Sequence, residues 1–125
     1  MLDGWVSAAN YMAKLPDETL TIAFNLQKRL LERIDAATAT EAIIFEQFGE
    51  AEIILVELEQ LYNIRERATS AYSRLYTLLL RVAESQPTAT SATLDLLAVS
   101  IDQAEATDFA SNATIQEIKG DLDLP

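Results

Sequence analysis

Apolar residues recur at alternating spacings of three and four along most of the chain, a pattern typical of amphipathic helices. No stretch keeps up the alternation of apolar and polar residues that marks a half-buried strand, so no sheet is expected. Only three glycines and three prolines interrupt the chain, which also favours helix. The sequence therefore predicts an all-α protein, an antiparallel helical bundle forming one domain over residues 1–125.

Two helices are expected in the first third of the chain. A short amphipathic helix covers residues 3–14, and a second helix runs over about 17–37. Pro16 separates them, because proline suits the first turn of a helix and disrupts an interior. Thr38 and Glu41 then fit a capping box, in which each side chain bonds the other residue's backbone N–H. A new helix is therefore expected to start at this point.

That third helix is expected over about 41–85. Its apolar seam keeps the 3-4 spacing of a coiled coil over more than four heptads. Gly49 is a candidate kink, and whether the helix continues through it stays open. The seam consists of Ala51, Ile54, Leu58, Leu61, Arg65, Ala68, Tyr72, Leu75, Leu79 and Val82.

A fourth helix is expected over about 91–120, after a loop at Pro87 and an N-cap at Thr90 or Ser91. The loop is short, so the third and fourth helices should form a long antiparallel hairpin. The helix at 17–37 should pack into its groove, and residues 121–125 should fray. The seam of the fourth helix consists of Leu94, Leu97, Ile101, Ala104, Asp108, Ser111, Ile115, Ile118 and Leu122.

Two charged residues occupy these seams, Arg65 in the third helix and Asp108 in the fourth. Folding the chain at Pro87 brings them to nearly the same level, so we predict a buried polar pair that fixes the register. Two alternatives stay open: the helices splay and both charges remain hydrated, or the two residues belong to a functional polar pocket.

A second charge pattern follows the flanks of the hairpin. Arg67, Arg74 and Arg81 recur every seven residues, as do Asp95 and Asp102. In the hairpin, Arg81 lies at the same height along the axis as Asp95, and Arg74 at the same height as Asp102. The arginines flank one edge of the apolar seam and the aspartates flank the opposite edge, so direct pairs within one hairpin are not expected. They are candidate partner-binding residues, and the alternative is a solvated surface.

Most of the aromatic residues are expected in the core because they fall at helical spacings. Leu55, Tyr62 and Tyr76 widen the apolar face of the third helix, which indicates more than one helical neighbour. Tyr72 and Tyr76 with Arg65 could instead line a ligand pocket. The aromatic residues concerned are Trp5, Tyr11, Phe24, Phe45, Phe48, Tyr62, Tyr72 and Tyr76.

The composition excludes several classes of function. Without cysteine or histidine there is no disulfide framework, zinc finger, iron–sulfur centre or Ser-His-Asp triad. Carboxylate pairs such as Glu46 with Glu50, or Asp102 with Glu105, could hold a metal, but solvated surface acids explain them more simply. No cofactor, no metal and no enzymatic activity are therefore expected.

Twenty acidic residues against nine basic ones give a net charge of −11, which repels nucleic acid and anionic membranes. No apolar run is long enough to span a bilayer, so a cytoplasmic protein is expected. The sequence favours a non-enzymatic interaction or assembly module that forms a homo-oligomer, typically a dimer, or docks on another helical protein. Two alternatives remain: an acidic inhibitor or nucleic-acid mimic binding a basic protein site, and a regulatory bundle that binds a small molecule.

Overall fold

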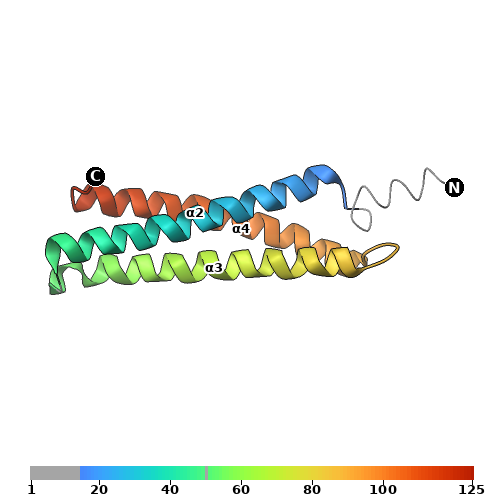
Figure 1. Cartoon of the computed structure of the whole chain (residues 1–125), viewed down its shortest axis with the longest axis horizontal. Helices are drawn as coiled ribbons and strands as arrows, with labels where there is room; N and C mark the ends of the chain where they lie inside the picture. The colour runs from blue at the N-terminus through green and yellow to red at the C-terminus, as the bar shows by residue number, and fades with distance from the viewer. Residues whose placement is uncertain (1–14, 50) are drawn as a thin grey trace.

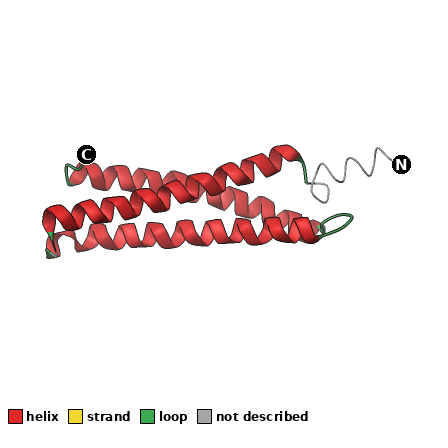
Figure 2. Cartoon of the chain, viewed as in Figure 1, coloured by secondary structure: helices red, strands yellow, loops and turns green. Residues whose placement is uncertain are grey.

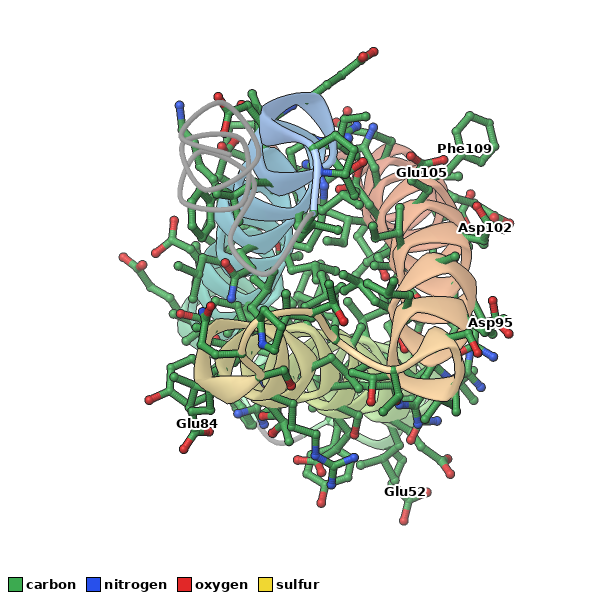
Figure 3. The ribbon with its side chains drawn as sticks, turned by 90° about the vertical axis from the view of Figure 1, so that its right-hand side faces the viewer. Glu52, Glu84, Asp95, Asp102, Glu105 and Phe109 are labelled. Atoms are coloured by element: carbon green, nitrogen blue, oxygen red, sulfur yellow. The ribbon has the colours of Figure 1, made fainter. Side chains whose placement is uncertain are left out.

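The computed structural model describes residues 15–49 and 51–125, which form three long helices packed side by side (Figure 1). They are α2 (Asp17–Phe48), α3 (Leu55–Glu84) and α4 (Ser91–Asp121). Each helix contacts both of the others, and viewed end-on they stand at the corners of a triangle (Figure 3). The described residues contain helices and loops but no strand (Figure 2). The predicted all-α bundle is confirmed, while the helix expected at 3–14 lies outside the described residues.

The first helix of the bundle is longer than the sequence predicted. α2 continues through Thr38 to Phe48, so the helix start expected at the capping box is wrong. The hydroxyl of Thr38 donates instead to the carbonyl oxygen of Ile34, at 2.9 Å, inside one continuous helix. The hydroxyl of Thr40 does the same to Ala36, at 2.7 Å. Threonine satisfies its hydroxyl within a helix in this way, so a capping motif in the sequence does not require a break.

The chain turns at Gly49 instead. Gly49 has φ +64°, a left-handed conformation that glycine adopts without a steric penalty. Its N–H donates to the carbonyl oxygen of Phe45 at 3.0 Å, which closes the last turn of α2. The short 3-10 turn η1 (Glu52–Ile54) follows and leads directly into α3. The predicted helix over 41–85 is therefore two segments, the end of α2 and the whole of α3.

The hairpin of α3 and α4 forms as expected, although its first helix begins later. α4 starts after Thr90, whose hydroxyl oxygen accepts the backbone N–H of Thr93 at 3.2 Å. This is the predicted N-cap, and it satisfies one of the free N–H groups at the helix start. At the other end, Leu122 and Leu124 pack against the core, and the N–H of Leu124 donates to the carbonyl oxygen of Lys119 at 2.8 Å.

Except for Ala51, which is exposed and precedes η1, the predicted seams of α3 and α4 line the core, together with a seam of α2 that runs through the supposed break. The buried apolar residues fall into two clusters along the bundle axis. The first contains Leu15, Ala23, Leu26, Leu30, Ala68, Leu75, Leu78, Leu79, Val82, Ala89, Leu97 and Ala104. The second contains Ala37, Ile44, Ile54, Leu61, Ile64, Ile115 and Ile118. Both clusters draw residues from all three helices.

Most aromatic side chains lie outside this core, contrary to the prediction. Tyr72 packs partly buried against the first cluster, but five of the others are exposed. Trp5 and Tyr11 lie outside the described residues. The difference arises because the seam of α2 follows Ala23 and Leu30, each one residue before a large apolar side chain, and one residue is a rotation of about 100° on a helix. The exposed five are Phe24, Phe45, Phe48, Tyr62 and Tyr76.

Candidate interaction surface

A polar layer separates the two apolar clusters. Asp108 of α4 is buried, and one carboxylate oxygen accepts a hydrogen bond from Nε of Arg33 in α2 at 2.8 Å. Its other oxygen lies 3.4 Å from a guanidinium nitrogen of Arg29. Arg33 also donates to the side-chain oxygen of Asn112 at 3.1 Å. The side chains of Arg33 and Asp108 are 21% and 9% exposed, so this pair is largely withdrawn from water.

The predicted pair of Arg65 and Asp108 is therefore wrong. Arg65 donates from Nε to Glu41 of α2 at 2.9 Å, and its guanidinium lies over the ring of Tyr62, 5.5 Å from the centroid. The physical reason is the third helix of the triangle: each seam charge of the hairpin meets an opposite charge on α2 instead of meeting the other. Sequence reasoning missed Arg33, although it lies inside the helix predicted over 17–37, because the predicted pair drew only on the seams of the third and fourth helices.

A second row of side chains, three of them large and apolar, runs along α2 outside the core. Phe24, Leu31, Thr38 and Phe45 follow one another at every seventh residue, each directly after one of the buried residues Ala23, Leu30, Ala37 and Ile44. We call these four residues the α2 row. Phe24, Leu31 and Phe45 are 54%, 51% and 49% exposed, so about half of each large side chain faces solvent.

α3 carries a matching row. Leu55, Tyr62, Thr69 and Tyr76 also recur at every seventh residue, each directly after a buried seam residue, and we call them the α3 row. All four are exposed.

The two rows lie along the same side of the α2–α3 interface. Glu41 stands three residues after one member of the α2 row and four before the next, so it shares that side of the helix. Arg65 holds the carboxylate of Glu41 and at the same time covers the ring of Tyr62 in the α3 row. This contact joins the two rows from opposite helices. We call the surface they form, with the exposed side chain of Phe48, the α2–α3 face.

Charge changes along this face. In the half of α3 near the turn, Glu59 and Glu66 each stand four residues after a member of the α3 row, so they border it. From residue 67 to residue 83, α3 contains no acid, although Glu84 ends this helix and Asp17 and Glu18 begin α2. The border of the α3 row is therefore acidic near the turn and free of acids over most of its other half.

The arginines and aspartates singled out by their spacing lie apart from each other. Arg74 donates to the side-chain oxygen of Gln103 in α4 at 2.6 Å, while Arg67 and Arg81 line open grooves between α3 and α4. Asp95 and Asp102 project away from the bundle on the outer side of α4, with Glu105 and Phe109 (Figure 3). Within residues 15–49 and 51–125, no ion pair joins the two groups.

The main pockets of the described residues are open grooves between helices or along one helix. The groove between α2 and α4, for example, is lined by Leu15, Ile22, Leu94 and Ile101. Among the described residues no three acidic side chains converge as metal ligands would. In the same part of the chain, no helix has the length and apolarity needed to cross a bilayer.

The apolar α2–α3 face is thus the feature of the described surface that most calls for a functional explanation. No family model matches the chain, and neither the curated proteins nor the solved structures compared with it give a match.

Proposed function

We propose that this chain is a non-enzymatic protein–protein interaction or assembly module that binds through its α2–α3 face. The observation that carries the proposal is the pair of apolar rows on adjacent helices. Large half-exposed side chains fill three of the four heptad positions on each helix, with a threonine at the other. An extended exposed apolar surface marks an interaction site far more often than scattered apolar residues do. A cytoplasmic location, expected from the sequence, stays a prediction, as does the expectation that nucleic acid and membranes are not partners.

The form of the face supports a helical partner. Two adjacent antiparallel helices that each carry an apolar row offer an elongated apolar surface, and an amphipathic helix or helix pair packs on such a surface with residues at matching spacing. The central polar layer supports the same proposal, because a charged layer inside the core holds α2 in one register against α4, and the α2 row depends on that register.

A second candidate function rests on a different surface. Asp95, Asp102 and Glu105 project together from the outer side of α4 (Figure 3), and residues 86–118 contain no lysine or arginine. An acidic inhibitor or nucleic-acid mimic would present such a flank to a basic protein site. Binding by this flank should weaken steeply as salt is raised, whereas binding by the apolar face should not.

Site-specific photo-crosslinking in the cell tests the two surfaces against each other. A benzophenone amino acid replaces Leu31 on the α2–α3 face, Phe109 on the acidic flank, or Leu96 as a control on a different side of α4. Leu96 is 52% exposed, almost the same as Leu31 at 51%. We expect a discrete adduct from position 31 and none from position 96. An adduct from position 109 alone would favour the acidic-flank function, and no adduct from either face would refute the interaction module.

A further inference from the structure

We propose that the partner on the α2–α3 face is a second copy of this chain, packed face to face with its long axis reversed. In this dimer α2 lies antiparallel over α2 of the other copy, and α3 over α3. The proposal rests on the proposed function, since it identifies the occupant of the same face.

The face is large enough for a stable dimer. Seven large apolar side chains lie on it, each exposed by between about two fifths and just over one half. A large apolar or aromatic side chain offers about 150–250 Å² when fully exposed, so half exposure of seven such chains gives roughly 525–875 Å². A standard stable interface buries about 800 Å² on each partner. The side chains are Phe24, Leu31, Phe45, Phe48, Leu55, Tyr62 and Tyr76.

The order of charges selects the reversed axis. With the axis reversed, the acidic half of α3, which holds Glu59 and Glu66, lies over the half of the other α3 that contains no acid from residue 67 to residue 83. If the two copies instead packed without this reversal, the acidic α2–α3 turn of one copy would lie over the same turn of the other. Each chain carries a net charge of −11, so an arrangement that keeps the acidic ends apart also reduces the repulsion between whole copies.

The N-terminal segment is a poorer match for the same face. The described part of the chain starts on another side of α2. Leu15 is buried and lines the groove between α2 and α4 together with Leu94 and Leu97.

The first test is the mass in solution. Light scattering at tens of micromolar should give about twice the chain mass of 13.8 kDa. Leu31→Lys places a charge in the middle of the face and should shift the mass to that of one chain. Leu96→Lys is the matched control, since Leu96 is 52% exposed on α4, and this variant should remain a dimer. Circular dichroism should show the same helix content for all three proteins.

The second test uses disulfide crosslinking to measure the relative orientation of the two copies. The chain contains no cysteine, so each introduced cysteine is the only one in its chain. Lys28 and Ala42 are exposed, and each stands four residues after one member of the α2 row and three before the next. They lie on opposite sides of the middle of that row, at nearly the same distance from it, about 6.5 and 7.5 residues. Under mild oxidation, a mixture of Lys28→Cys and Ala42→Cys should form the mixed disulfide, whereas neither variant alone should crosslink efficiently.

Three outcomes would overturn the second-copy proposal: a wild-type mass of one chain, equal loss of the dimer in Leu31→Lys and Leu96→Lys, or self-crosslinking of Lys28→Cys without the mixed product. The proposed function fails separately. A one-chain mass together with a photo-adduct between position 31 and a different protein would remove the dimer and leave the interaction module in place.

Discussion

The central polar layer gives the sharpest prediction about stability. In Asp108→Leu, the guanidinium of Arg33 loses its 2.8 Å partner while remaining only 21% exposed. Breaking a fully buried ion pair costs about 3–5 kcal/mol, and an exposed pair contributes about 0–1 kcal/mol. Because Arg33 keeps some contact with water and with Asn112, we expect Asp108→Leu to lower the free energy of unfolding by about 2–3 kcal/mol. Replacing both residues by leucine should cost clearly less than the sum of the single changes.

The assay is a double-mutant cycle by urea denaturation of Arg33→Leu, Asp108→Leu and the double variant, all at one protein concentration because self-association would shift apparent stability. We expect a coupling of about 1–2 kcal/mol. The control cycle pairs Asp108→Leu with Arg65→Leu. Arg33 and Glu41, the partner of Arg65, are eight residues or about 12 Å apart on α2, so this cycle should be additive. Coupling in the control cycle and none in the first would refute the pairing described above.

Three further predictions follow from local structure and can be measured by the same urea denaturation. Thr90→Ala should cost about 1 kcal/mol because it removes the N-cap of α4, whereas Thr38→Ala should be neutral or slightly stabilising because Thr38 lies inside α2; a loss at Thr38 as large as that at Thr90 would indicate a helix start there. Gly49→Ala should cost about 1–2 kcal/mol, since a Cβ meets no neighbouring atom but φ is +64°, and an unchanged midpoint would mean that the turn has another conformation. Leu75→Ala should cost about 2–5 kcal/mol, because Leu75 is fully buried in the first cluster, and a loss below 1 kcal/mol would contradict that placement.

Periodicity predicted the helical class and the seams of α3 and α4, because a buried face needs apolar residues at helical spacing whatever the neighbours are. It did not locate the turn between α2 and α3. There a local capping motif at Thr38 competed with a longer signal: the buried positions Ala23, Leu30, Ala37 and Ile44 continue at every seventh residue through the supposed break. Extending that seam would have kept α2 whole and left Gly49 as the turn.

The same spacing, applied within the predicted range 17–37, would have found part of the polar layer. Continuing the 3-4 spacing from Leu26 and Leu30 places Arg33 in the seam of α2, where a charge requires a partner. What periodicity could not supply is the choice between partners. Arg65 and Asp108 do lie in facing seams, but a third helix adds Arg33 and Glu41 as competitors, and only the packed bundle determines which charges meet.

A three-helix bundle needs one apolar seam on each helix, and α4 conforms to this requirement. Its exposed large apolar residues, Leu96, Val99 and Phe109, do not repeat at seven and form no row. α2 and α3 each carry an additional row at heptad spacing, on the side where they meet each other. These rows do not follow from packing the three helices, and exposed apolar rows favour aggregation if nothing covers them. The difference between α4 and the other two helices is therefore the strongest reason to assign the rows to a binding partner instead of to the fold.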